Sequence, residues 1–424
     1  MEIANQKVLV LSEIFFPEVT STGYFLTKIA EGLSNSYAVK VLAGPIANES
    51  QITDVLDEDK IRQIEIHRCN GTEFDKNWLP GRILNGITRS FAIFYESLKL
   101  CDRGDIIFVV TNPPLLPFFA LLLSWLKGAK LVLLVHDVYP EALIASGLIK
   151  KNSLPSKIIQ LANKFLCRKA DRLVTIGRDM SKVLSEKVSN QEKLCCIPNW
   201  ADLELVHPAS KQDNPVLQKL DMTENFVVLH AGNMGRTHDI ELLAHAAVTL
   251  EKENSNVRFV FVGSGAKKEW LAEFIAENKL SNVHLLPFLP HSEKNISLNA
   301  CDVAIISYLP DMAGISVPSR MYNHLASGKP IIAVADAWSE LAQVVLEDNV
   351  GWNSHPGDLE SLVDIIRQAA QNPEQCQQMG DKAAAIAREK YTLEHSDRAY
   401  SKLFESLCSA ETALASKARR PKRG

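Results

Sequence analysis

The chain alternates short, nearly continuous apolar runs with longer segments of mixed polarity. In its first half the runs predict strands at 7–11, 38–42, 64–67, 106–110, 131–135, 173–176 and 194–197. The segments 23–33 and 79–98 have the mixed pattern of helices. Strands that are apolar throughout and alternate with helices are typical of a parallel sheet covered on both faces.

The second half repeats this alternation, with strands predicted at 226–229, 257–261, 303–306 and 331–334. Between the halves, residues 208–214 (PASKQDN) are polar and contain a proline, as linkers often do. A chain of 424 residues suits two domains better than one. We therefore expect two α/β domains, at 1–207 and 208–390, with a crevice between them.

Glycine-bearing loops follow three of the predicted strands of the second half. They are 230–239 (HAGNMGRTHD), 261–268 (FVGSGAKK) and the loop around Gly314. Glycine lets a backbone approach a phosphate closely, and open parallel sheets bind ligands at the carboxyl ends of their strands. After the third loop a helix is predicted to begin near Pro318, with Arg320 in its first turn. Such a helix start favours an anion, for example a nucleotide diphosphate.

Two places in the first half are candidates for the opposite wall of the crevice. His136 and Asp137 follow an apolar strand directly, at its carboxyl end. Gly23 opens the first helix, where its backbone could reach the same diphosphate. The alternative for the second place is a plain N-cap turn made by Ser21 or Thr22.

Together these pieces resemble the retaining glycosyltransferases of family 4, which have the GT-B fold of two Rossmann-like, doubly wound domains facing a cleft. The matching pieces are SEIFFPEVTSTGYF (12–25), VHDVYPE (135–141), ADRLVTIGRDM (170–180), IPNWAD (197–202), HAGNMG, FVGSG, LPFLP (286–290) and VPSRMYNHLASGKP (317–330). Their order and spacing cover nearly the whole chain. The chain is most similar to the bacterial branch that builds surface polysaccharides and includes fucosamine transferases.

The resemblance implies transfer of a sugar from a UDP- or GDP-linked donor to a lipid-linked or oligosaccharide acceptor, with retention. It implies that a last helix, 391–413, packs back on the first domain, before a basic tail at 414–424. His136 and Asp137 are the expected catalytic residues, because the family places a histidine there against the donor sugar. The expected donor-binding residues are Gly23, Gly232, Asn233, Gly235, Arg236, Gly263, Gly265, Lys267, Phe288, Ser316, Val317, Ser319, Arg320, Asn323 and Glu340.

The chain departs from the family at positions that usually carry charge. Two glutamates of the family correspond to Ile315 and Asn323 here. The arginine and lysine of its G-R-x-x-x-x-K-G motif correspond to Asn233 and His238. We interpret these differences as a sub-branch with its own donor contacts, in which the Asn323 amide can still bind ribose hydroxyls.

Three further side chains are assigned on this basis. Arg236 and Lys267 are the nearest substitutes for the missing phosphate charges. Glu340 follows Ser339 at a turn from strand to helix and resembles a family glutamate. It would equally serve as a first-turn acid that complements the helix dipole.

Composition limits the cofactors and partners. The net charge is −4, from 46 basic and 50 acidic residues, which does not indicate nucleic acid. Eight scattered cysteines without a CxxC motif predict a reducing cytosol and no disulfide framework. The acidic run at 57–59 has no histidine in pattern with it, so we expect a solvated loop, no metal and no cofactor.

Membrane contact is expected to be peripheral. The most apolar stretch, 113–126, has 14 uncharged residues and is too short to cross a bilayer of about 30 Å. We expect a buried helix there, with shallow membrane contact as the alternative. Arg82, Arg89 and the tail 417–424, with five basic residues in eight, offer contacts with an anionic surface. No charged n-region precedes the first apolar run, so no signal peptide is predicted and the expected location is cytoplasmic.

Two other functions fit the same fold. A nucleotide-sugar epimerase would change the donor without an acceptor, and it would need carboxylates around the sugar. A non-catalytic nucleotide-sugar-binding protein would leave the donor unchanged. Incubation with UDP- and GDP-sugars alone separates both from a transferase.

Overall fold

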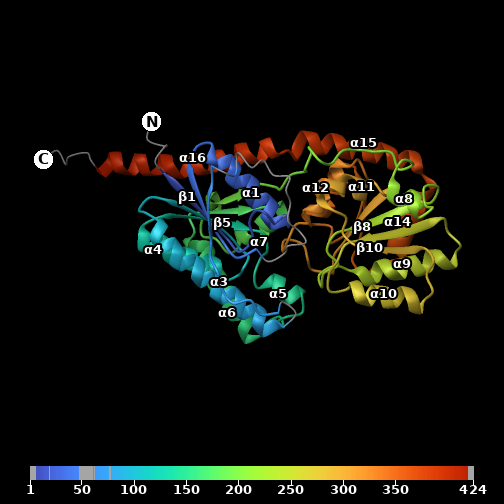
Figure 1. Ribbon diagram of the computed structural model, residues 1–424, viewed down its shortest axis with the longest axis horizontal. Coiled ribbons are helices and arrows are strands. Elements are labelled where there is room, and N and C mark those ends of the chain that lie inside the picture. The colour runs from blue at the N-terminus through green and yellow to red at the C-terminus, as the bar shows by residue number, and fades with distance from the viewer. Residues whose placement is uncertain (1–5, 19, 47–60, 62, 76–77, 419–424) are drawn as a thin grey trace.

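A computed structural model describes residues 6–18, 20–46, 61, 63–75 and 78–418. They form two lobes, each with a parallel sheet between layers of helices (Figure 1). The acidic run at 57–59 and the tail end at 419–424 lie outside the described residues. The α/β class with two doubly wound domains is therefore confirmed.

The first sheet has seven parallel strands in the order β3-β2-β1-β4-β5-β6-β7. Its strands are β1 Lys7–Ser12, β2 Ala38–Ala43, β3 Glu65–Arg68, β4 Ile106–Val110, β5 Lys130–Val135, β6 Arg172–Thr175 and β7 Leu194–Cys196. Its helices are α1 Ser21–Ser34, α3 Leu79–Leu100, α4 Leu116–Lys127, α5 Glu141–Ala145, α6 Leu154–Lys169, α7 Arg178–Ser185 and the 3₁₀ turn η3 Gln191–Lys193. All the strands predicted for this half are present.

The second sheet has six parallel strands in the order β10-β9-β8-β11-β12-β13. Its strands are β8 Phe226–Ala231, β9 Val257–Val262, β10 Val283–Leu286, β11 Val303–Ser307, β12 Ile331–Val334 and β13 Gly351–Ser354. Its helices are α8 Pro215–Lys219, α9 Ile240–Lys252, α10 Lys268–Glu277, η4 His291–Glu293, α11 Lys294–Leu298, α12 Arg320–Ala326, α13 Glu340–Glu347, α14 Leu359–Gln371, α15 Pro373–Lys390 and α16 Leu393–Ala418. The two outermost strands, β10 and β13, were not predicted.

Each sheet reverses its winding at one place, between β1 and β4 in the first domain and between β8 and β11 in the second. Neighbouring connections leave in opposite directions there, so the carboxyl ends of these strands border an opening. Open α/β sheets bind their ligands at such a switch point. The loops after β1, β4, β8 and β11 therefore border the expected ligand sites.

Two helix starts differ from the sequence prediction. Thr20, not Ser21 or Thr22, is the N-cap of α1, and its hydroxyl accepts from the Gly23 N–H at 3.2 Å. Helix α12 begins at Arg320, two residues after Pro318, because the Met321 N–H already bonds the Pro318 carbonyl in a tight turn at 3.0 Å. Arg320 is thus the first residue of a seven-residue helix.

Helix α4 is only half buried. Leu116, Leu121 and Leu123 are enclosed, whereas Trp125 and Leu126 are 55% and 61% exposed. The expectation of a buried helix at 113–126 is therefore correct for one face only. Within the described residues no helix is long and apolar enough to cross a membrane.

The final helices run along one side of both lobes (Figure 1). In α16, the rings of Tyr400 and Phe404 pack against Phe108 of β4, with centroids 5.9 and 5.7 Å apart. At the junction with α15, the Tyr391 ring lies 5.0 Å from that of Tyr322 in α12. The C-terminal segment thus packs on both domains.

Candidate active site

The glycine loops of the second domain pack tightly against one another. A Cβ on Gly263 would lie 2.0 Å from the Gly232 carbonyl oxygen, and one on Gly265 would lie 2.5 Å from the Met234 oxygen. Both glycines have positive φ, 148° and 142°. Glycine is therefore required here because two loops meet, a reason that the sequence prediction, which invoked only a phosphate, did not include.

These loops form a row across the carboxyl edge of the sheet. Phe288 follows β10, Gly263 follows β9, Gly232 follows β8 and Arg320 follows β11, in the order of the strands. A Cβ on Gly263 would meet the Phe288 ring at 3.4 Å, and one on Gly232 would meet the Arg320 guanidinium at 3.2 Å. The Phe288 ring, 47% exposed, is free to be covered by a flat ligand group. The row thus has an aromatic end and a cationic end.

Arg320 is held by groups that carry no negative charge. Its guanidinium donates to Nε2 of His230 at 3.2 Å and to Nε2 of His238, and it lies 3.4 Å from the Asn233 carbonyl oxygen. In the part of the chain that the structure describes, no carboxylate forms an ion pair with Arg320. Burial lowers the pKa of Arg320, and proximity to the Tyr308 hydroxyl opposes this effect. A half-buried cation without a counter-ion favours an anionic ligand.

Three histidines around Arg320 are neutral. Burial and the guanidinium charge lower the pKa of His238 to about 2 and that of His324 to about 3, and they lower the pKa of His230 well below its usual value. Because Arg320 can only donate, Nε2 of His230 and of His238 must accept, which fixes the proton on Nδ1. The arginine therefore carries the charge of this cluster.

Lys267 and Arg236, the other two cations predicted to bind phosphate, have different surroundings from Arg320. Lys267 forms an ion pair with Glu241 at 2.6 Å and donates to the His238 carbonyl at 2.7 Å, so its charge is already balanced. Arg236 is exposed in the loop after β8. Gly235 precedes it, and a Cβ there would lie 2.9 Å from the Asn233 amide nitrogen.

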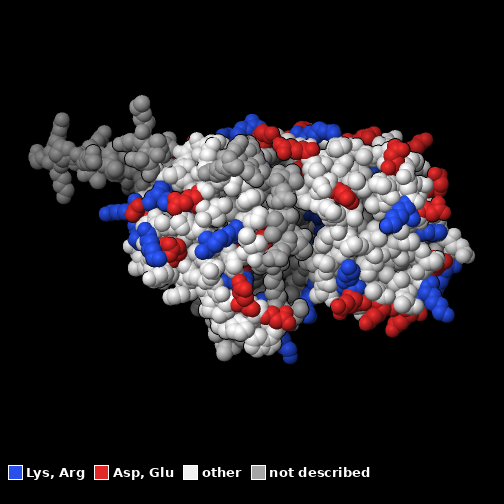
Figure 2. Space-filling view, viewed as in Figure 1, with Lys and Arg blue, Asp and Glu red and all other residues white. Residues whose placement is uncertain are grey.

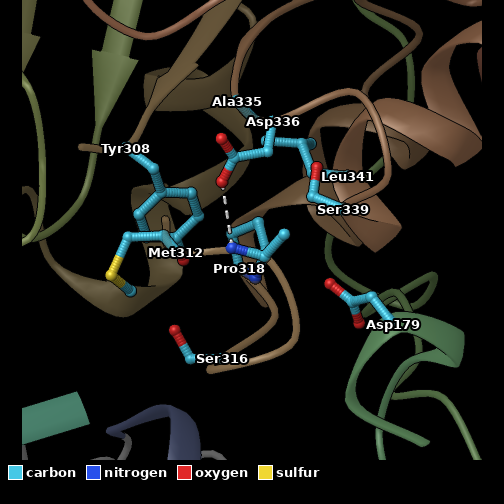
Figure 3. Close-up of a pocket in the computed structure, with 10 residues that line it drawn as sticks. Asp179, Tyr308, Met312, Ser316, Pro318, Ala335, Asp336, Ser339 and Leu341 are labelled. Atoms are coloured by element: carbon cyan, nitrogen blue, oxygen red, sulfur yellow. Dashed lines mark hydrogen bonds between the residues drawn. The ribbon is translucent and has the colours of Figure 1, made fainter. Parts of the chain in front are cut away.

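The loop from β11 to α12 closes a narrow pocket against the first domain (Figure 3). It is lined by Tyr308, Met312, Ser316, Pro318 and Asp179, and its free volume of about 10 Å³ has room for one water molecule. The Asp336 carboxylate accepts from the Ala313 N–H at 3.2 Å and supports this loop. The pocket itself is thus too small for a nucleotide sugar.

The same loop bridges the two domains. The Val138 N–H, next to His136 and Asp137, donates to the Ile315 carbonyl at 3.0 Å. Val317 is buried against Gly177, where a Cβ would lie 2.6 Å from its methyl group. These contacts bring the His136 loop beside the segment that leads to Arg320.

One more contact joins the first helix of the chain to the same loop. The hydroxyl of Ser21 in α1 donates to that of Ser319 at 2.9 Å. Ser319 lies immediately before Arg320, so the start of α1 is next to the cationic end of the row.

His136 and Asp137 lie at the carboxyl end of β5 as predicted. Thr111, at the end of β4, accepts from both of their backbone N–H groups with Oγ1, at 3.1 and 3.2 Å. Nδ1 of His136 is 3.4 Å from Oγ1 of Thr22 in α1, while its buried Nε2 has no partner among the described residues. Burial lowers the pKa of His136 to about 4 and raises that of Asp137 to about 6.

Glu340 and Asn323, which were predicted to bind the donor, form hydrogen bonds across the domain junction. Glu340 accepts from the Arg178 backbone N–H at 2.7 Å and from its Nε at 3.1 Å, and the Glu340 N–H donates to Asp179 at 2.9 Å. Asn323 accepts from the Asp202 N–H at 3.1 Å with its amide oxygen. The N–H of Gly23 is likewise occupied by the Thr20 hydroxyl.

Sequence reasoning did not find His230, Tyr308, Thr111 or Asp179. His230 is the one polar residue of the apolar strand β8 (FVVLHA), and this is the signal in the sequence that could have marked it. The Tyr308 ring stacks on His238 with centroids 5.1 Å apart, and its phenol is near Arg320. Nothing local distinguishes Thr111 or Asp179, because their partners lie elsewhere in the chain.

Known glycosyl transferases match both halves of the chain. The family model for a glycosyl transferase 4-like domain matches residues 22–200, and that for glycosyl transferases group 1 matches residues 215–385. The chain is 34% identical over 366 residues to the probable glycosyltransferase WbjE of Pseudomonas aeruginosa, covering 85% of this chain and 88% of that protein. It is 29% identical over 254 residues to the putative colanic acid biosynthesis glycosyl transferase WcaI of Escherichia coli K12, covering 58% and 62%.

Solved structures show the same fold. HepE of Anabaena, in complex with UDP and glucose, superposes with a TM-score of 0.72 at 17% identity, over 95% of this chain and all of that chain. WaaG, a glycosyltransferase involved in lipopolysaccharide biosynthesis, superposes with a TM-score of 0.66 at 14% identity, over 93% and 98%. At these identities the likeness concerns the fold alone.

Proposed function

Because the chain belongs to the group 1 glycosyl transferases, we propose that it moves a sugar from a UDP- or GDP-linked donor to a lipid-linked or oligosaccharide acceptor in the synthesis of a surface polysaccharide. Its relative WcaI, named for colanic acid biosynthesis, supports this product class. HepE, which binds UDP and glucose, supports a UDP-linked donor. We also infer retention and membership of the fucosamine-transferase-like branch, from the motif resemblance.

The observation that carries the proposal is Arg320, a half-buried guanidinium among neutral histidines without a carboxylate partner in the described chain. A diphosphate would supply the missing negative charge. We place the nucleobase at the exposed Phe288 and the diphosphate at Arg320, with Gly263 and Gly232 between them. Stabilising the leaving diphosphate is the main electrostatic demand of glycosyl transfer.

We assign the sugar to the side of the first domain. Nε2 of His136 is buried without a partner there, so a neutral imidazole can donate to a sugar hydroxyl. During transfer the bond from the anomeric carbon to the phosphate oxygen breaks, and a bond to the acceptor oxygen forms. The acceptor loses its proton, and Asp137, with a pKa of about 6, is a suitable base at neutral pH.

We keep the domain division of 1–207 and 208–390, with 391–413 as a helix returning to the first domain. The packing of Phe404 on Phe108 supports that return. Lys267 and Arg236 are proposed as secondary phosphate contacts, since ligand binding could draw Lys267 from Glu241.

A thermal-shift screen of UDP, GDP and their sugars tests the proposal. A ligand present at 100 times its Kd stabilises the folded state by about 2.7 kcal/mol. We expect a shift with UDP or GDP that is absent in an Arg320→Ala variant. Donor consumption without acceptor would indicate an epimerase instead, and no shift with any nucleotide would contradict the proposal.

A further inference from the structure

Exposed apolar side chains are concentrated on three helices of the first domain. Of 20 exposed large hydrophobic residues in the described chain, 12 belong to α3, α4 and α6. Exposed apolar area of this extent on one region marks an interaction surface. The twelve are Ile83, Leu84, Ile87, Phe91, Tyr95, Leu122, Trp125, Leu126, Leu154, Ile158, Leu161 and Phe165.

These residues form one continuous surface, which we call the α3–α4–α6 face. Spacings of three and four residues place them on a single side of α3 and of α6. Phe91 of α3 contacts Phe119 of α4 at 6.3 Å between ring centroids, and Trp125 of α4 contacts Phe165 of α6 at 5.9 Å. Figure 1 shows α3, α4 and α6 gathered on the side of the first lobe away from α16.

Basic side chains predominate along α6 and the loop before it. From residue 142 to 170 the sequence has six basic residues and no acidic residue, and α4 has no charge before Lys127. Lys150, Lys151 and Lys157 are exposed, as are Arg168 and Lys169 at the end of α6. Figure 2 shows basic and acidic side chains mixed over the visible surface of both lobes, and α3 itself carries Glu96, paired with Lys99 at 2.6 Å, so the basic character belongs to α6 and the loop before it.

We propose that the α3–α4–α6 face docks the protein on a lipid bilayer with anionic headgroups. Exposed leucine, isoleucine and aromatic side chains can enter the headgroup boundary, while lysines bind the headgroups through their long stems. Each basic residue adds attraction to an anionic surface. A protein partner would need acidic side chains that match these lysines, and no described feature of this face points to such a protein.

The position of the face relative to the site strengthens the proposal. The loop carrying Asp137 leads through α5 directly into α6. Burial and the Asp137 charge raise the pKa of the Tyr139 phenol. Exposed Arg82, at the start of α3, is close enough to Tyr139 to oppose part of that rise. The bilayer would therefore lie beside the His136 loop. A membrane beside this loop would help a lipid-linked acceptor to reach the site. That advantage rests on the proposed function, whereas docking itself does not.

Arg82 and Arg89, which the sequence analysis expects to contact a membrane, differ in exposure. Arg89 is buried, with 7% of its side chain exposed, and its guanidinium pairs with Glu13. It therefore cannot contact a membrane, contrary to the sequence prediction. Arg82 remains available.

Vesicle sedimentation with the full chain tests the proposal. We expect binding to phosphatidylcholine vesicles that contain about one third phosphatidylglycerol, weaker binding to phosphatidylcholine alone, and partial release at high salt. Ile158→Asp with Leu161→Asp should lower the affinity about tenfold or more, since both side chains are exposed (59% and 72%) and the fold does not depend on them. The matched control is Leu346→Asp on α13, a 53% exposed leucine of the second domain.

A second pair of variants tests the charge. Lys150→Glu with Lys157→Glu should reduce the preference for anionic vesicles, whereas Lys219→Glu with Lys252→Glu, exposed in the second domain, should not. UDP-induced thermal shifts of all variants should match those of the parent, so failure of docking is distinguishable from failure of the proposed function. No binding to anionic vesicles at low salt would overturn the proposal. So would a dimer in gel filtration that Ile158→Asp with Leu161→Asp dissociates, because the face would then be a self-interface.

Discussion

Arg320 donates from its guanidinium to Nε2 of His238, so two groups that could both be cations form a hydrogen bond. The contact requires a neutral imidazole, and burial together with the guanidinium charge lowers the pKa of His238 to about 2. The motif resemblance aligns His238 with a lysine of the family and Asn233 with an arginine. Arg320, from α12, is the charged side chain beside these two positions.

Replacing Arg320 should weaken donor use. We expect Arg320→Ala to reduce kcat/KM for the nucleotide sugar. The loss of transition-state stabilisation should be about 1.5–3 kcal/mol, the range for a hydrogen bond to a charged group. Arg320→Lys should recover only part of this, because an ammonium cannot reproduce the two-sided contact with His230 and His238. Steady-state kinetics with varied donor measure the loss.

Arg367→Ala is the matched control for that prediction, since Arg367 is an arginine of the second domain whose ion pair with Glu253 is exposed. Its kinetics should equal those of the parent. Unchanged kinetics in Arg320→Ala, for every donor, would remove Arg320 from the site.

His136→Ala should reduce turnover while leaving nucleotide affinity intact. The ring contacts Thr22 and belongs to the first domain, opposite the proposed nucleotide row. We expect kcat to fall about tenfold or more, with the Kd of UDP or GDP within about twofold of the parent. His136→Asn, which keeps a donor, should retain more activity, and exposed His245→Ala should have no effect. An equal loss of nucleotide affinity would assign His136 to the fold or to the nucleotide pocket.

Activity should survive EDTA. Arg320 meets the phosphate charge in our proposal, and among the described residues no cluster of three or more histidine, cysteine, aspartate or glutamate side chains has the geometry to hold a metal. Initial rates with and without chelator should agree. A complete loss that Mg²⁺ or Mn²⁺ restores would show that a metal bridges the diphosphate.

Glu340 is expected to act at the domain junction more than at the donor. Its carboxylate is 8% exposed and binds both the backbone and the side chain of Arg178. Glu340→Ala should therefore lower the free energy of unfolding by about 1.5–3 kcal/mol, measured by denaturant titration. Glu360, an exposed first-turn glutamate of α14, is the control, and its loss should cost about 0.3–1 kcal/mol. A clear loss of UDP affinity in Glu340→Ala would restore its predicted role in donor binding.

Much of the fold follows from local pattern, and much of the site does not. Strands such as β4 and β5 are apolar throughout, because both faces of a central parallel strand are covered. Strand β13 (GWNS) lies at the sheet edge, where one side lacks a neighbouring strand, and its sequence has no apolar run. Helix-start signals placed Arg320 correctly to within one turn.

The neighbours of Arg320 could not be predicted in the same way. His230 and His238 precede it by 90 and 82 residues, and only the pairing of β8 with β11 brings them together. Glycines were predicted from sequence as phosphate contacts, but Gly263 and Gly265 also fill a steric requirement between two loops. Such requirements depend on where the loops meet, which no local pattern encodes.

Asp137 should reduce stability at neutral pH, and its removal should therefore stabilise the protein. Burial raises the pKa of Asp137 to about 6 from the usual 3.8. A group whose pKa is raised in the folded state favours folding fully only below its unfolded pKa, and that contribution is lost as pH rises through the folded value. At pH 7 the carboxylate is charged in a site that disfavours charge. Asp137→Asn should accordingly increase the free energy of unfolding by about 1–3 kcal/mol at pH 7, since one pKa unit corresponds to about 1.4 kcal/mol.

The gain should shrink below pH 6 and vanish only below the unfolded pKa of 3.8, where the carboxyl is protonated in both states. His136 has the opposite sign, because its lowered pKa, about 4, costs stability as pH falls below its usual 6.5. Melting curves of the parent and of Asp137→Asn between pH 4 and 8 therefore separate the two groups. The same variant should lose transferase activity, because an amide cannot accept the acceptor's proton. A variant that is more stable and less active at pH 7 would mark Asp137 as a residue held in a costly environment for function; a variant that is destabilised at pH 7 would show that the carboxylate makes favourable contacts there.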